Sequence, residues 1–123
     1  MEPPRYESIR VGAEGIRGEL VLADPDRLNP LGTATLIEIA DAARWLDSQN
    51  GLKAVVVRGE GRAFSAGADL TAFEAPVTLD AEAADAGRRM AEAVEGIAAV
   101  TVARLQGHCV GGGVVLAAAC DLR

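Results

Sequence analysis

Three consecutive valines, Val55–Val57, constrain the fold of this chain more than any other part of its sequence. Valine is β-branched, and an unbroken run of such residues is typical of a strand that is buried on both faces within a parallel sheet. The segments on either side of the run, 32–48 and 80–98, have helical periodicity. Thr33 or Thr35 is expected to cap the first of these helices. A buried strand between two helices predicts an α/β fold, in which helix-linked strands pair in parallel.

The remaining segments extend this pattern in both directions along the chain. Loose alternation of apolar and polar residues over 6–11 and 16–22, around a glycine-rich turn at 12–15, predicts a β-hairpin. Residues 100–105 predict another strand, and residues 114–120 predict a last helix. The two longer helices each carry one apolar stripe: Leu36, Ile39, Ala43 and Leu46 on the first, and Met90, Val94 and Ile97 on the second. The predicted element order is therefore ββαβαβα.

Composition narrows the class of protein. The 123 residues are enough for one domain with a modest core. A net charge of -6 argues against nucleic-acid binding and against attraction to anionic membranes. The N-terminus has no apolar signal segment and no run is long enough to cross a bilayer, so we expect a cytoplasmic protein. Cys109 and Cys120 are expected to be free thiols in a reducing compartment, and their spacing does not indicate a metal site.

Two small-residue turns carry the strongest functional signal. The segments 63–70 and 111–113 each follow an apolar, strand-like run. Gly67 permits a backbone conformation that frees the N–H of Ala68. Gly112 lies at the start of a helix, where N–H groups stabilise negative charge. Brought together, the two N–H groups would form an oxyanion hole, the geometry that stabilises negative charge developing on an acyl oxygen.

Each of these features also has a purely structural interpretation. The first turn is equally explained as a tight strand-to-helix connection in which Asp69 is a structural acceptor, and the glycine triplet as a close-packing device. His108 has no nucleophile or orienting acid placed beside it, so packing is favoured over a general-base role. Ser65 lacks the GxSxG context of a serine nucleophile. Arg27 and Arg62 flank the predicted cleft and could contact a phosphate, although most surface arginines are solvated.

Taken in order, the motifs of this chain resemble those of the enoyl-CoA hydratase/isomerase, or crotonase, family. Each motif is moderately specific alone, whereas the ordered set is strongly so, and the resemblance runs from about residue 6 to the end of the chain. The matching pieces are Asp-Arg-Leu-Asn-Pro-Leu at 26–31, Ala-Val-Val-Val at 54–57, Gly-Arg-Ala-Phe-Ser-Ala-Gly-Ala-Asp-Leu at 61–70, Gly-x-x-x-Gly-Gly-Gly at 107–113 and Ala-Ala-Cys-Asp-Leu at 118–122.

The resemblance implies an α/β crotonase-like spiral of ββα units, with residues 1–123 as the N-terminal part of an acyl-CoA-binding domain. It also implies assembly as trimers or pairs of trimers. The N–H groups of Ala68 and Gly112 are expected to hold the thioester oxygen of an acyl-CoA and to stabilise an enolate-like anion. Coenzyme A is then part of the substrate, not a separate cofactor. The residues expected to bind it are Arg27, Leu28, Asn29, Ala66, Ala68, Asp69, Leu70, Gly111 and Gly112.

Departures from the family pattern affect the expected chemistry. Family hydratases commonly carry a glutamate at the position of Val115, and valine cannot transfer a proton. The family's other acid is expected beyond Arg123, so a one-acid reaction such as double-bond isomerisation fits better than two-acid hydration. The usual asparagine before Gly107 is Gln106, a minor change. Two alternatives stay open: a non-catalytic acyl-CoA-binding homologue, and a structural fragment whose site is incomplete without later elements.

Overall fold

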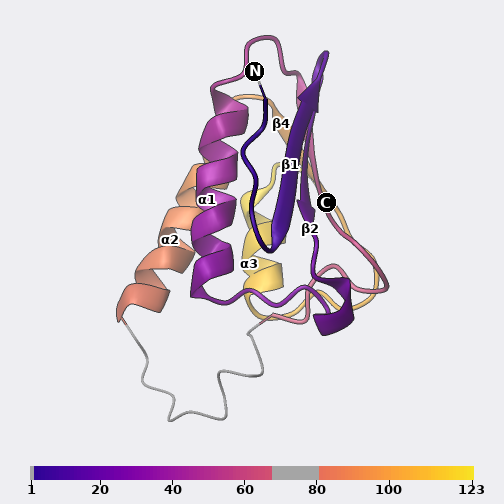
Figure 1. Ribbon diagram of the computed structural model, residues 1–123, viewed down its shortest axis with the longest axis vertical. Coiled ribbons are helices and arrows are strands. Elements are labelled where there is room, and N and C mark those ends of the chain that lie inside the picture. Colours follow the sequence, from indigo (N-terminus) through magenta and orange to yellow (C-terminus); the bar gives the residue numbers. More distant parts are fainter. Residues whose placement is uncertain (1, 68–80) are drawn as a thin grey trace.

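The computed structural model describes residues 2–67 and 81–123. Helices and strands alternate along the chain after an initial strand pair, so the predicted ββαβαβα order is confirmed (Figure 1). A short 3₁₀-helix, η1, occupies Pro25–Arg27 between β2 and α1. The elements are β1 (Ile9–Glu14), β2 (Arg17–Leu22), α1 (Thr33–Asp47), β3 (Ala54–Gly59), α2 (Ala81–Glu95), β4 (Val100–Arg104) and α3 (Gly112–Ala119).

The described strands form one 4-stranded sheet in the order β1-β2-β3-β4. β1 and β2 pair antiparallel, as the predicted hairpin requires, and both helix-linked pairs, β2–β3 and β3–β4, are parallel. The hairpin turn is tighter than expected, because β1 continues through Glu14 and only two residues, Gly15 and Ile16, separate it from β2. Gly15 makes this turn possible with a φ of +60°.

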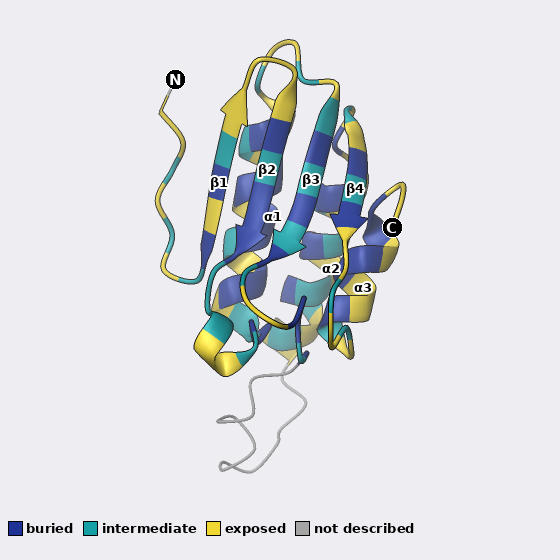
Figure 2. Cartoon of the chain, turned by 90° about the vertical axis from the view of Figure 1, so that its right-hand side faces the viewer, coloured by how far each residue is buried: buried dark blue, intermediate teal, exposed yellow. Residues whose placement is uncertain are grey.

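The helices α1, α2 and α3 lie on one face of the sheet, and this corrects the prediction for Val55–Val57 (Figure 2). Val55 and Val57 are fully buried, whereas Val56 is only half-buried. Side chains of a strand alternate between its two faces, so covering one face buries every second valine. On the open face Arg58 pairs with Glu19 of the neighbouring strand at 2.8 Å. Charged residues in the two strands, Arg58 and Glu19, are the sequence feature that argues against burial of both faces.

The predicted apolar stripe of the first helix is confirmed, because its four members are all buried on α1. On α2, Met90 and Val94 are buried as predicted, whereas Ile97, although buried, lies beyond the end of the helix at Glu95. α1 packs against α2 and against β1 and β2, and the stripes of both helices belong to a single core with the buried side chains of the sheet. The predicted cap of α1 is wrong, since Gly32 occupies the N-cap position and no side chain caps the helix. Thr35 lies inside the first turn of the helix and is buried.

Two acidic side chains of α1 hold the segment that precedes β1. Glu38 accepts hydrogen bonds from the backbone N–H groups of Glu7 and Ser8, both at 3.0 Å. The hydroxyl of Tyr6 donates to the carboxylate of Asp41. Partial burial, followed by this hydrogen bond and the nearby carboxylate charges, raises the pKa of Tyr6 above its usual value.

We expect this tyrosine to resist ionisation in the folded chain. Because its folded-state pKa is raised, its contribution to stability is complete below the unfolded-state pKa of about 10 and is lost as the pH rises toward the folded-state pKa. Tyr6 is the only tyrosine in the sequence, so tyrosinate absorbance reports on it alone. Titration in buffer is expected to give a higher midpoint than titration in concentrated urea, and equal midpoints would contradict the contact with Asp41.

Both cysteines are free, as predicted. Cys120 is buried, and burial raises the pKa of its thiol to about 11. Within 2–67 and 81–123 no cluster of three metal-ligating side chains forms. None of the helices in these two ranges has the length and hydropathy that a membrane span requires.

Candidate functional site

The candidate site lies where the parallel strands end. The carboxyl ends of β2, β3 and β4 point toward the same end of the molecule (Figure 2). The connections that follow these strands therefore meet there, and they are the loops 23–32, 60–67 and 105–111. The carboxyl ends of parallel strands are the usual place for ligand sites in α/β folds.

Backbone hydrogen bonds tie the three loops side by side. Ala66 N–H donates to Leu28 at 2.9 Å, and Leu31 N–H donates to Gly67 at 2.7 Å. On the other side of the middle loop, Ser65 N–H donates to His108 at 3.0 Å, and Val110 N–H donates back to Ser65 at 3.2 Å. The two flanking loops are therefore paired in parallel with the middle one, like a short second sheet.

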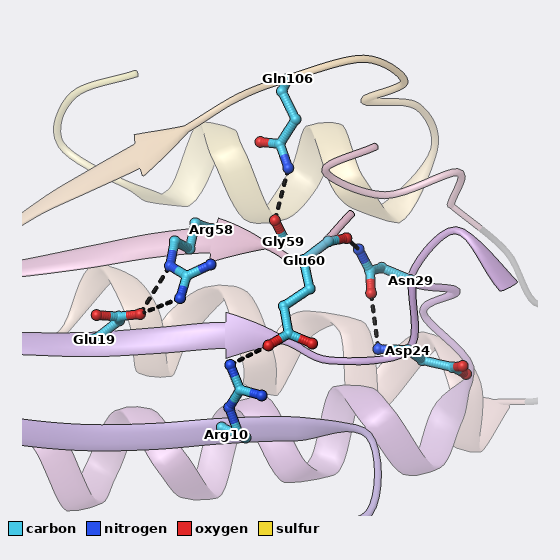
Figure 3. A network of polar contacts seen from close by, with 8 residues as sticks. All are labelled: Arg10, Glu19, Asp24, Asn29, Arg58, Gly59, Glu60 and Gln106. Carbon is cyan, nitrogen blue, oxygen red and sulfur yellow. Dashed lines mark hydrogen bonds and ion pairs between the residues drawn. The ribbon is translucent and has the colours of Figure 1, made fainter. Parts of the chain in front are cut away.

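The amide of Asn29 holds the first and middle loops together (Figure 3). Its Nδ2 donates to three backbone carbonyls, those of Glu60 at 3.0 Å, Ala63 at 3.0 Å and Phe64 at 3.2 Å. Its Oδ1 accepts from Asp24 N–H at 2.9 Å. Only 2% of Asn29 is exposed, so its side chain contributes to the site by shaping these loops.

Gln106 performs a similar task from the third loop. Its Nε2 donates to the carbonyls of Gly59 at 2.6 Å and Gly61 at 3.2 Å (Figure 3). The sequence reasoning treated Gln106 as a minor change. The sequence signal for this role is a glutamine directly before a glycine, because a long amide side chain can reach back to a neighbouring turn.

Two glycines, Gly67 and Gly113, allow the loops to approach one another. A Cβ on Gly67 would lie 2.8 Å from the Val110 oxygen and 3.3 Å from the Gly111 Cα. A Cβ on Gly113 would lie 2.9 Å from that of Ser65. Gly67 also has a φ of +87°, which favours glycine. The described parts of the two predicted turns are thus in direct contact, at a distance that excludes side chains.

Gly112 begins α3, so its N–H has no acceptor inside the helix. The next three N–H groups are used in the turn: Gly113 donates to Val110, and Val114 and Val115 both donate to Gly111. Among the described residues no backbone carbonyl takes the N–H of Gly112. Gly112 as a whole is half-buried.

The remaining predicted residues fall into three groups. Ala68, Asp69 and Leu70 lie outside the described residues. Ala66 and Gly111 belong to the paired loops, and Arg27 forms an ion pair with Asp24 at 3.2 Å. A shallow hollow beside the loops is lined by Leu28, Arg62, Gly107 and His108. The structure therefore brings Leu28 together with His108 and with Arg62, one of the two arginines expected to flank the cleft.

Val115 points out of the fold, because 48% of its surface is exposed on α3. Val114 is similarly exposed, at 50%. Nearly every side chain of this helix is apolar, on its exposed face as well as on its buried one. Among the described residues, α3 thus presents an aliphatic surface without an acid at this position.

The chain is similar to known proteins over most of its length. The family model described as enoyl-CoA hydratase/isomerase matches residues 14–123. A Thermus thermophilus protein assigned as an enoyl-CoA hydratase is 40% identical over 105 residues, which are 82% of this chain and 42% of that protein. The crotonyl-CoA hydratase of Syntrophomonas wolfei is 29% identical over 120 residues, 96% of this chain and 46% of that protein.

Solved structures share the fold. The crystal structure of an enoyl-CoA hydratase/carnithine racemase from Magnetospirillum magneticum matches with a TM-score of 0.84 and 30% identity. The match covers 95% of this chain and 45% of that one. The chain therefore spans less than half the length of each of these three relatives.

Proposed function

We propose a function that proceeds from one premise: the chain belongs to the enoyl-CoA hydratase/isomerase family. Its proposed role is to bind an acyl-CoA thioester and to stabilise an enolate-like anion on the thioester oxygen. The two donors are the backbone N–H groups of Ala68 and Gly112. Coenzyme A lies along the loops that contain Arg27–Asn29 and Ala66–Leu70. Assembly of the whole protein as trimers or pairs of trimers is part of the same proposal.

The single observation that carries this proposal is the contact between the two glycine-rich turns. Gly67, which precedes Ala68, lies against Val110 and Gly111, which precede Gly112. Two backbone donors that follow such closely packed glycines are suited to one shared acceptor. Donors held by the fold need no reorganisation when negative charge develops, and this is the source of their effect in acyl chemistry.

Val115 favours isomerisation over hydration within this proposal. Hydration requires one group to deliver water and another to protonate carbon, whereas moving a double bond requires one group that takes and returns a proton. The aliphatic side chains of α3 supply no such group at the family's glutamate position. One carboxylate from elsewhere in the protein would complete the isomerase reaction. The same valine supports the second candidate, a homologue that binds acyl-CoA without catalysis.

Calorimetric titration with crotonyl-CoA and, separately, with free coenzyme A tests the proposal. The thioester is expected to bind about tenfold tighter, because free coenzyme A lacks the oxygen that two N–H groups would hold, and each net hydrogen bond contributes about 0.5–1.5 kcal/mol. Equal affinity for the two ligands would contradict an oxyanion site. A failure to bind either would contradict the proposal as a whole for this chain.

Ala68→Pro is expected to remove most of the thioester's advantage in that titration. Proline has no N–H, so one of the two proposed donors disappears. The affinity ratio of crotonyl-CoA to coenzyme A should fall from about tenfold to about threefold, because one of the two hydrogen bonds that give the tenfold preference is lost. Ala68→Gly keeps the N–H and is the matched control, for which we expect a ratio within about twofold of the original. An unchanged ratio in Ala68→Pro would rule out this donor.

A further inference from the structure

Ser65 is completely buried, and its hydroxyl is fully engaged within the protein. Its Oγ donates to the Asn29 carbonyl at 2.7 Å and accepts from the Gly67 N–H at 3.0 Å. Both the proton and a lone pair of the hydroxyl are therefore used. A group held in this way cannot attack a substrate, so its role must lie in what it holds.

The Ser65 hydroxyl and the first loop together fix Gly67 from both sides. The N–H of Gly67 donates to Ser65, and its carbonyl accepts from Leu31 N–H at 2.7 Å. The Gly67 carbonyl belongs to the same planar peptide unit as the N–H of the following residue. Holding Gly67 by both its N–H and its carbonyl therefore constrains the backbone that leads into the proposed donor.

We infer that Ser65 is a positioning residue for the oxyanion site: its hydroxyl aims the peptide that joins Gly67 to Ala68 without touching the substrate. This role depends on the function proposed above. The Ser65 hydroxyl is itself held by the Asn29 carbonyl. Because the Asn29 side chain is hydrogen-bonded to three carbonyls of the middle loop, the position of the Ser65 hydroxyl does not depend on the turn at Gly67 alone. Without the hydroxyl, the Gly67 N–H and the Asn29 carbonyl both lose a partner, and the turn is free to relax.

Acetoacetyl-CoA gives a direct readout of this role. The CH₂ between its two carbonyls loses a proton to solvent, and the resulting enolate, unlike the keto form, absorbs in the near ultraviolet. Bound ligand therefore reports how well the site holds an oxyanion, without any catalytic acid. Misplacement of a catalytic group by about 1 Å lowers a reaction rate on the order of a hundredfold. Relaxation of one of two donors should therefore lower the bound enolate-to-keto ratio about tenfold.

The variant Ser65→Ala is therefore expected to show a tenfold lower enolate ratio while its affinity for free coenzyme A stays within about twofold. Ser65→Cys keeps a weak donor and acceptor at the γ position, and its ratio should lie between those of the other two proteins. Gln106→Ala is the matched control, since it removes the hydrogen bonds to Gly59 at the end of β3 and to Gly61 in the middle loop, but none from Gly67. It should lose stability and keep the wild-type enolate ratio.

The outcomes separate this inference from the function it depends on. If wild-type protein binds acetoacetyl-CoA without favouring its enolate, the oxyanion proposal fails. If wild type favours the enolate and both Ser65 variants equal it, the oxyanion proposal stands and the positioning role is wrong. If the enolate ratio fell equally in Gln106→Ala and Ser65→Ala, the positioning role would also be wrong, because general loosening of the loop would then explain both decreases.

Discussion

Gly107→Ala is expected to lower the free energy of unfolding by about 3–5 kcal/mol, from the sum of backbone strain and steric overlap. Gly107 has a φ of +57°, a conformation that costs a residue with a Cβ about 1–2 kcal/mol. The added Cβ would also lie 2.0 Å from the Arg62 oxygen and 3.2 Å from the Ala63 Cα. Both obstacles are backbone atoms, so the third loop would have to move away from the middle loop.

Urea unfolding monitored by the single tryptophan, Trp45, measures this loss. Gly15→Ala is the matched control, because Gly15 has a φ of +60° and nothing within 4 Å of an added Cβ. It should show the backbone strain alone, about 1–2 kcal/mol. Similar losses in the two variants would show that the contact with Arg62 is unimportant.

Asn29→Asp is expected to cost at least about 3 kcal/mol at pH 7, although it changes only one atom of the side chain. The new carboxylate would keep the acceptor used by Asp24 but would place an oxygen against three carbonyl oxygens that now accept hydrogen bonds. Burial and these oxygens disfavour the charged form, so the pKa of the new carboxyl should be raised in the folded state. The loss should therefore be smaller near pH 4 and grow as the pH rises toward 7.

The control for this variant is Asn50→Asp, the same chemical change at an exposed position. Its effect should stay within about 0.5 kcal/mol at both pH values. Urea unfolding at the two pH values gives the comparison. If Asn29→Asp unfolded at the same urea concentration as the wild type, the buried amide would not be holding the middle loop.

Local patterns predicted the elements of this fold well. The stripe from Leu36 to Leu46 repeats at helical spacing, and each member needs only its own helix and the sheet beneath to be buried. The burial of Val56 could not be predicted from local patterns. Its burial depends on what covers the far face of the sheet, and a run of valines does not distinguish one covered face from two. Arg58, two residues further along the same face, carried the missing information.

The candidate site was predictable in its glycines and less so in its polar contacts. Gly67 and the triplet at 111–113 stand out in the sequence because turns and close approach require them. Asn29 was expected to bind the ligand, whereas its amide is used to join two loops. Its partners are backbone carbonyls more than thirty residues away, which no sequence pattern identifies. The roles of Ala68, Asp69 and Leu70 stay predictions.

The three loops tied side by side at the candidate site have a consequence for the kinetics of folding. The residues joined there, such as Leu31 with Gly67 and Ser65 with His108, are separated by whole strand–helix units. Contacts of such high sequence separation form slowly, because the entropy of closing long segments must be overcome before the contacts form. The site should therefore assemble late in folding, after β2, β3 and β4 have aligned, and a ligand bound there should mainly slow unfolding.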